Sequence, residues 1–267
     1  MTGVAIVRPV AGQCSPVRSR TPWIQLPLPR PSARLRLYCA PYAGGGTGVY
    51  RGWTDDLDER IELRSILLPG RERRFVEPAL SSVEALADGL VPDLSETLDP
   101  PYALFGHSLG ASLVFETALR LSAAGRPPVH VVVSGAHAPQ LPRRGPEYHQ
   151  LADAEFVSGI KGLGGTPPEL TENAELLELL LPTLRADFTA AETYRQDGGR
   201  RLPCPITAIG GSDDPLVDRA GLEGWAALTS AACHVHELPG DHFFLATARS
   251  AVIQIVNQEL TAHLSPL

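Results

Sequence analysis

The residues that could do chemistry first appear near the middle of the chain, where Gly106-His107-Ser108-Leu109-Gly110 places a serine between two glycines. In a G-x-S-x-G turn, the glycines let a strand and a helix pack closely while the turn lifts the serine hydroxyl clear of the sheet. A chain with 25 glycines can contain this spacing by chance. Here, however, the apolar run 102–105 precedes the turn and the strong helix formers of 111–119 follow it. This context predicts Ser108 as a nucleophile at the N-terminus of a helix.

A serine hydroxyl reacts slowly near neutral pH unless a histidine accepts its proton and a carboxylate orients that histidine. Downstream of the serine, the runs Gly211-Ser212-Asp213-Asp214-Pro215 and Pro239-Gly240-Asp241-His242 each follow a strand candidate. The spacing favours Asp214 as the acid, with Asp213 as the competing candidate. His242 is the candidate base. The order serine, acid, histidine is the one that goes with a G-x-S-x-G turn.

Acyl transfer to a serine also requires two backbone N–H groups that face the developing negative charge. Leu109, directly after the nucleophile, is expected to supply one. The run Tyr42-Ala43-Gly44-Gly45-Gly46 follows an early strand candidate and is expected to supply the other, with the Ala43 N–H favoured over that of Tyr42. A phosphate-binding loop is disfavoured here because the spacing is not that of a P-loop and its lysine is missing. His107 is expected to pack or hydrogen-bond locally rather than act as the base.

These candidate residues need a scaffold that brings them together, and short apolar runs alternate with helical patterns from residue 34 onward. Such alternation predicts an α/β fold with a mostly parallel central sheet flanked by helices. Ser108, Asp214 and His242 each follow a strand candidate, so all three would meet at the carboxyl edge of the sheet. The expected strands are 35–40, 63–68, 103–106, 129–134, 206–210 and 235–238, and the expected helices are 47–58, 82–97, 109–124, 218–229 and 243–263.

The alternation stops between about residues 140 and 200, a gap far longer than the roughly 2 to 6 residues of an ordinary connection. The run 175–194 is rich in Leu and Ala at helical spacing, interrupted by Pro182, and is expected to form a helical lid, with an ordinary core helix as the alternative. Residues 1–33 combine Arg and Pro without an acidic residue and are expected to be a flexible extension or a loosely docked strand. The expected organisation is that extension, followed by one catalytic domain over 34–267 with its lid at about 140–200.

The composition disfavours several kinds of partner. A net charge of −7 and a pI near 5.6 argue against nucleic acid, which requires a basic surface. The sequence lacks the apolar core of a secretory signal and any stretch of about 20 apolar residues, so no membrane association is expected. The four cysteines are scattered without a C-x-x-C pair, which favours reduced thiols in a cytoplasmic protein and gives no indication of zinc. We expect a monomer with no metal and no cofactor.

Five further runs accompany the serine turn, and the middle ones are more specific than it: Cys39-Ala40-Pro41-Tyr42-Ala43-Gly44-Gly45, Leu68-Pro69-Gly70-Arg71-Glu72-x-Arg74, Leu163-Gly164-Gly165-Thr166-Pro167, Leu181-Pro182-x-Leu184-Arg185-Ala186-Asp187-Phe188 and Gly240-Asp241-His242-Phe243-Phe244. With these runs the chain resembles the type II thioesterases, stand-alone editing enzymes of polyketide and nonribosomal peptide assembly lines. The resemblance covers roughly residues 35–260. It implies the α/β-hydrolase fold with a helical lid over the site.

The resemblance also implies a reaction and a partner. The substrate would be an acyl thioester on the phosphopantetheine arm of an acyl or peptidyl carrier protein, hydrolysed without a cofactor. Carrier proteins are usually acidic, so Arg71, Arg73, Arg74 and the lid-borne Arg185 are candidate docking residues, although Arg71 could equally be structural and tie its loop down. Two alternatives stay open, because one fold serves many functions. These are a lipase or esterase acting on free esters, and a non-catalytic binding protein.

Overall fold

A computed structural model describes residues 23–98, 101–143, 145–165 and 173–264 of the chain. Seven strands form one sheet in the order β1-β3-β2-β4-β5-β6-β7. All neighbouring strands are parallel except β1, which pairs antiparallel with β3 at the edge. The strands are β1 (Ile24–Gln25), β2 (Leu35–Ala40), β3 (Ile61–Ile66), β4 (Tyr102–His107), β5 (His130–Ser134), β6 (Ile206–Gly211) and β7 (Cys233–Leu238).

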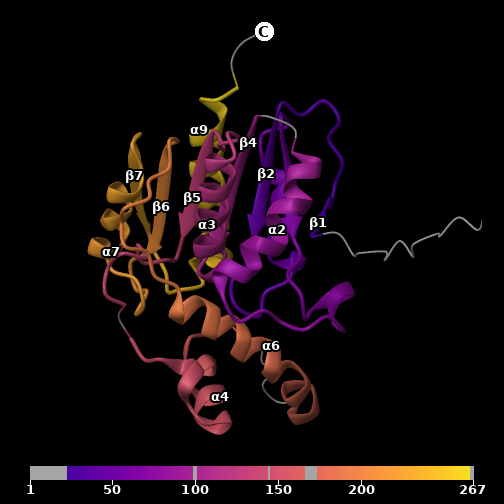
Figure 1. Cartoon of the computed structure of the whole chain (residues 1–267), viewed down its shortest axis with the longest axis vertical. Coiled ribbons are helices and arrows are strands. Elements are labelled where there is room, and N and C mark those ends of the chain that lie inside the picture. Colours follow the sequence, from indigo (N-terminus) through magenta and orange to yellow (C-terminus); the bar gives the residue numbers. More distant parts are fainter. Residues whose placement is uncertain (1–22, 99–100, 144, 166–172, 265–267) are drawn as a thin grey trace, which may run out of the picture.

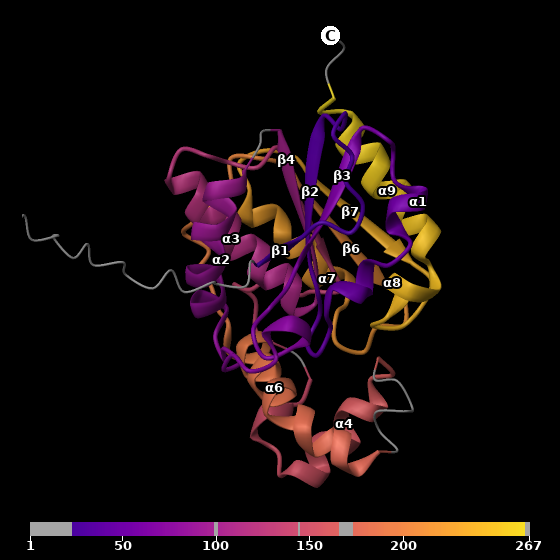
Figure 2. The ribbon, with the colours of Figure 1, turned by 90° about the vertical axis from the view of Figure 1, so that its right-hand side faces the viewer.

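Helices cover both faces of the sheet, with α2 and α3 on one side and α1, α8 and α9 on the other (Figure 2). The longer helices are α2 (Val83–Thr97), α3 (Leu109–Ala123), α4 (Asp153–Gly162), α6 (Ala174–Thr193) and α9 (Arg249–Thr261). The shorter ones are η1 (Thr47–Tyr50), α1 (Trp53–Asp56), η2 (Glu72–Arg74), η3 (Tyr148–Gln150), α7 (Arg219–Glu223), η4 (Gly224–Leu228) and α8 (Phe244–Thr247). The predicted α/β-hydrolase architecture is confirmed.

The burial pattern of β2 shows why its residues, apart from Arg36, are apolar on both faces of the strand. Tyr38 and Ala40 belong to the core cluster shared with α2 and α3, whereas Leu37 and Cys39 belong to the cluster shared with α1 and α9. Successive side chains of a strand point to opposite faces, and both faces of this sheet are covered. Because both faces of this sheet are buried, its strands lack the alternation of polar and apolar residues that a half-exposed strand shows.

Several predicted helices are divided in the structure. Residues 47–58 form η1 and α1, separated at Gly52, whose φ of 77° lies in the left-handed region that suits glycine. Likewise, residues 218–229 form α7 and η4, and residues 243–263 form α8 and α9.

The strand order reverses beside β2, because the chain goes from β2 outward to β3 and then returns to form β4 on the other side of β2. In open α/β sheets, such a reversal leaves a crevice at the carboxyl ends of the two central strands. Here it brings the glycine-rich loop after β2 beside the serine turn after β4.

The segment between β5 and β6 contains η3, α4 and α6. Helices α4 and α6 lie past the ends of the strands, below the sheet in Figure 1. Helix α6 begins at the N-cap Asn173, whose side chain accepts from Leu176 N. Its two ends have different environments. Ala190 lies in the core cluster, whereas Leu179 is 55% exposed. The C-terminal half of α6 thus packs as a core helix, and the division into a domain and a lid stays a prediction.

Over residues 23–33, the N-terminal segment is docked on the sheet through a short strand, which is the second of the two expected arrangements; residues 1–22 lie outside the described residues. Trp23 is 1% exposed and packs beneath the Arg74 guanidinium at 4.1 Å. The strand β1 pairs with β3. Arg30 donates to the carbonyl oxygens of Asp58 at 2.8 Å and Ile61 at 2.9 Å. These contacts hold a proline-rich segment that has little secondary structure of its own.

The cysteines of the described residues behave as core residues rather than nucleophiles. Cys39 and Cys204 are buried and unpaired. Burial raises the pKa of the Cys204 thiol to about 12 and that of Cys39 well above its ordinary value. A thiol with so high a pKa holds little reactive thiolate. No helix among the described residues has the length and apolar character required to span a membrane.

Candidate active site

The turn between β4 and α3 places Ser108 in a strained backbone conformation, with φ 54° and ψ −116°. A left-handed φ at a residue other than glycine is costly and concentrates at functional sites. The flanking glycines allow the turn because a Cβ at Gly106 would lie 2.0 Å from the Gly110 oxygen, and one at Gly110 would lie 2.2 Å from the Ala40 oxygen. Strand β4, helix α3 and strand β2 therefore meet at glycine backbone.

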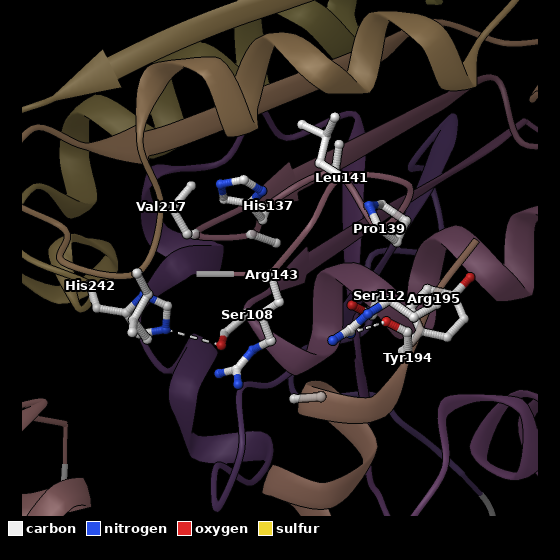
Figure 3. A pocket seen from close by; sticks show the side chains of 15 residues that line it. Ser108, Ser112, His137, Pro139, Leu141, Arg143, Tyr194, Arg195, Val217 and His242 are labelled. Carbon is white, nitrogen blue, oxygen red and sulfur yellow. Dashed lines mark hydrogen bonds between the residues drawn. The ribbon is translucent and has the colours of Figure 1, made fainter. Parts of the chain in front are cut away.

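The three candidate triad residues form a continuous chain of hydrogen bonds. His242 Nε2 lies 3.0 Å from Ser108 Oγ (Figure 3), and His242 Nδ1 lies 2.8 Å from Asp214 Oδ2. The Asp214 side chain is fully buried, and its other oxygen accepts from Leu216 N at 2.8 Å. A proton can therefore pass from the serine to an imidazole that a buried carboxylate orients.

Asp213, the competing candidate, has a different environment. Its side chain is exposed and accepts from Ser212 Oγ at 3.2 Å. Its backbone N–H donates to Gly240 O at 2.9 Å, which ties the acid loop to the base loop. These contacts favour Asp214 as the residue that orients His242.

His107 forms the local hydrogen bonds expected of it. The ring is fully buried, with Nδ1 2.9 Å from Ser134 Oγ and Nε2 2.9 Å from the His242 backbone oxygen. A carbonyl oxygen only accepts, so Nε2 of His107 carries the proton, and Nδ1 accepts from the Ser134 hydroxyl. Burial, aided by repulsion from His242, lowers the pKa of His107 to about 3. His107 is therefore a neutral residue that holds the backbone of the candidate base.

The two backbone groups assigned to the oxyanion hole are both available to a ligand. Leu109 is the first residue of α3, where a helical N–H has no intrahelical acceptor. In the loop after β2, Gly44 N donates to Asp187 Oδ2 at 2.7 Å and Gly45 N donates to Tyr42 O at 2.9 Å. Within the described residues, the N–H groups of Ala43 and Leu109 have no acceptor. An oxyanion could accept from both.

Ser108 and His242 line a cavity of about 100 Å³. Its walls come from the segment after β5 and from the C-terminal end of α6, and they include Arg143, Tyr194 and Arg195 (Figure 3). A second cavity of about 350 Å³ lies between the glycine-rich loop and α6 and includes Leu177, Leu180 and Leu184. The residues after β5 were not among the predicted site residues, although they too follow the carboxyl end of a strand.

Three of the four arginines predicted as docking residues have partners within the chain, and for Arg71 these contacts favour the open alternative that it ties its loop down. Arg71 is 7% exposed and binds Asp187, and Arg74 is 3% exposed and binds Glu77 and the Leu67 oxygen. The turn η2 directs residues 71 and 74 inward from the same side, which the charged run did not indicate.

Arg185 donates to the His149 and Leu151 oxygens and to Asp153, so its hydrogen-bonding groups are used within the chain. Arg73 remains a candidate docking residue, because its side chain is exposed.

This fold and site define an α/β-hydrolase with a candidate serine, histidine and aspartate triad. Residues 35–260 match the thioesterase domain family. The chain belongs to the thioesterase family, and the predicted resemblance is confirmed.

The chain is also similar to individual proteins over nearly its whole length. It is 42% identical over 246 residues to linear gramicidin dehydrogenase LgrE of Brevibacillus parabrevis, covering 91% of this chain and 94% of the relative. It is 38% identical to gramicidin S biosynthesis protein GrsT of Aneurinibacillus migulanus, covering 88% and 92%. The solved type II thioesterase BorB from the borrelidin biosynthetic cluster has a TM-score of 0.80 at 35% identity, covering 90% of this chain and 96% of BorB. The name of the first relative describes another reaction, and membership of the family rests on the match over residues 35–260.

Substitution of the two neighbouring aspartates separates their roles. In Asp214→Asn, the side-chain amide can present an N–H to His242 Nδ1 and favour the wrong tautomer, so kcat is expected to fall by about 10⁴-fold. Asp213→Asn removes the same charge one residue away and should change kcat by less than about threefold. Steady-state thioester hydrolysis measures both variants. Equal losses in the two would refute the assignment of Asp214.

The low pKa of His107 predicts a loss of stability in mild acid. As the pH falls below the ordinary pKa of 6.5, the unfolded chain takes up a proton on His107, whereas the folded chain does so only near pH 3. Between pH 7.5 and 5, this difference should lower the free energy of unfolding by about 2 kcal/mol. Urea unfolding of His107→Asn at both pH values should show a smaller loss than the parent protein. His234→Asn, at a half-exposed position, is the control, and an undiminished loss in His107→Asn would contradict the prediction.

Proposed function

We propose that the protein hydrolyses acyl thioesters carried on the phosphopantetheine arm of acyl or peptidyl carrier proteins, and so removes stalled or aberrant acyl groups during polyketide or nonribosomal peptide synthesis. The observation that carries the proposal is the hydrogen-bond chain from Asp214 through His242 to Ser108. It is supported by similarity to GrsT, a gramicidin S biosynthesis protein, and to BorB, a type II thioesterase from the borrelidin biosynthetic cluster.

The proposed chemistry consists of two acyl transfers. His242 Nε2 takes the hydroxyl proton as Ser108 Oγ attacks the thioester carbonyl carbon, and the N–H groups of Ala43 and Leu109 stabilise the resulting oxyanion. The C–S bond then breaks, the acyl group remains on Oγ, and His242 returns the proton to the departing thiolate. In the second half, a water molecule gives a proton to His242 and attacks the acyl carbon. The free acid leaves as Ser108 regains its proton.

The proposed partner is an acidic carrier protein, bound by a cytoplasmic and monomeric enzyme. Of the four candidate docking arginines, Arg73 is exposed, and two exposed apolar side chains lie close behind it in the sequence, Phe75 at 41% and Val76 at 92% exposure. A cation beside exposed apolar groups suits a transient interface with an acidic protein. The free, unpaired state of Cys39, Cys204 and Cys233 fits a reducing compartment.

A hydrolysis assay against a panel of acylated carrier proteins tests the reaction and the partner together. The kcat/KM for acyl-carrier thioesters should exceed that for p-nitrophenyl oxyesters of the same acyl chain, and Ser108→Ala should lower kcat by about 10⁴-fold or more on either. Mass spectrometry of the carrier measures the loss of the acyl group. Faster turnover of the oxyesters would identify an esterase instead, and undiminished hydrolysis by Ser108→Ala would refute the mechanism.

The contribution of Arg73 to docking can be measured as a ratio. The kcat/KM on an acyl carrier, divided by that on the acyl N-acetylcysteamine thioester, should fall about 10-fold in Arg73→Glu because an acidic partner is now repelled. Arg60→Glu is the control, since Arg60 is 43% exposed and directly precedes β3, at the end of that strand opposite to Arg73. A ratio in Arg73→Glu equal to that of the control would exclude Arg73 from the docking surface.

A further inference from the structure

Two of the sequence runs that the chemistry does not use, around Arg71 and around Asp187, meet beneath the glycine-rich loop. We propose that the buried Asp187–Arg71 pair is a positioning element, which holds the Ala43 N–H in the oxyanion hole and makes that hole depend on the placement of α6. The inference rests on the proposed function, because it concerns the same site. It concerns how the loop is held and assigns neither residue a contact with the substrate.

Asp187 connects α6 to the loop directly. Its carboxylate is 1% exposed, and Oδ2 accepts from Gly44 N at 2.7 Å. The same oxygen accepts from Arg71 Nη1 at 2.8 Å, while Oδ1 accepts from Arg71 Nη2 at 2.7 Å. Charge-assisted bonds of this length are strong and directional. The peptide between Ala43 and Gly44 is therefore held from its nitrogen.

Arg71 extends the clamp to the peptide between Gly45 and Gly46. Its Nη1 also donates to the Gly45 oxygen at 2.9 Å, and Nη2 and Nε donate to the Pro69 oxygen at 3.2 and 3.3 Å. One guanidinium thus joins the glycine-rich loop, the loop after β3 and α6. All of its hydrogen-bonding groups are used inside the protein, which leaves it no role toward an external partner.

The neighbouring Glu72 holds the far end of the loop. Its carboxylate accepts from Thr47 N at 2.7 Å and from Thr47 Oγ1 at 2.8 Å. Among the described residues, Glu72 and Ser108 are the two non-glycine residues with positive φ, 47° and 54°. Backbone strain of this kind persists where the surroundings enforce it and marks functional sites. Here both strained residues belong to the segments that surround the oxyanion hole.

The loop needs such a clamp because of its composition. Three successive glycines, Gly44 to Gly46, give the backbone many accessible conformations, and Gly44 occupies the left-handed region at φ 76°. An oxyanion hole works only if its donors are in place before the charge develops. Fixing Gly44 N and Gly45 O restricts the backbone dihedral angles on the C-terminal side of Ala43. The direction of the Ala43 N–H is restricted in turn.

The same contacts make the hole sensitive to α6. A Cβ on Gly44 would lie 2.5 Å from Leu184 Cδ2, so the helix packs directly on the loop. Leu177, Leu180 and Leu184 of α6 also line the second cavity. A ligand that displaces the helix from this cavity would withdraw the Asp187 carboxylate from Gly44, and the Ala43 N–H would lose its support.

The first test compares Asp187→Asn with Glu178→Gln, an exposed carboxylate on the same helix. In either orientation, the asparagine NH₂ faces a donor, Gly44 N or Arg71. We expect kcat to fall at least about 10-fold with KM little changed, and the inhibition constant of a trifluoromethyl ketone, which forms an oxyanion on the serine, to rise by a similar factor. Glu178→Gln should match the parent protein. Unchanged kcat and inhibitor binding in folded Asp187→Asn would overturn the proposal.

A second variant separates positioning from stability, since a lone buried charge can unfold the protein. The double substitution Arg71→Met with Asp187→Leu fills the site with apolar groups, a change that often restores stability. We expect thermal stability near that of the parent protein but kcat lower by about 100-fold, because the contacts to Gly44 and Gly45 stay lost. Recovery of kcat along with stability would show a merely structural pair and overturn the proposal.

Arg71→Lys retains the paired charge but cannot bridge Asp187, Gly45 and Pro69 together, so it tests the same idea in a chain that keeps the ion pair. It should lower kcat and inhibitor affinity in parallel, and normal values of both would again overturn the proposal. All rates are measured with an acyl N-acetylcysteamine thioester. This substrate needs no carrier protein, so a failure of the carrier assignment would leave the outcome of these tests unaffected.

Discussion

The placement of the whole site depends on one close approach of backbone, that of β4, α3 and β2 at Gly106 and Gly110. No side chain could occupy either position without meeting carbonyl oxygens at about 2 Å. This approach forces the strained turn at Ser108 and also sets the distance between the serine and the loop after β2. Because β2 and β4 are neighbours at the point where the strand order reverses, the nucleophile and the glycine-rich loop reach the same crevice.

Much of the site could be predicted because each of its loops follows a strand. Ser108, Asp214 and His242 carry local signals, namely glycine or proline turns directly after apolar runs, and parallel strands bring their carboxyl ends together. The choice of Asp214 over Asp213 required only a spacing. Local signals of this kind survive in a single sequence because they come from backbone geometry, which neighbouring residues determine.

The sequence did not indicate the internal contacts of side chains whose partners are far away along the chain. The run from Arg71 to Arg74 has the composition of an exposed charged surface, yet Asp187, which neutralises Arg71, lies 116 residues further along the chain. No local pattern indicates such a pair. Trp23 was missed for a related reason, since the strand that follows it, β1, has two residues and the pocket that receives the indole is built by α2 and Arg74. Long-range burial of isolated residues requires the fold itself.

The hydrogen bond from His107 to the His242 backbone has a consequence for the second half of the reaction. Once Ser108 carries an acyl group, its oxygen has no proton to share, and the bond that joined it to the imidazole is gone. The base loop would then depend on its remaining anchors. In the proposed mechanism, the neutral His107, whose Nε2 lies 2.9 Å from that carbonyl oxygen, would keep the imidazole over the acyl-enzyme while a water molecule replaces the departed thiol. The residue beside the nucleophile would thereby preserve the resting position of the His242 backbone after the serine–histidine hydrogen bond is lost.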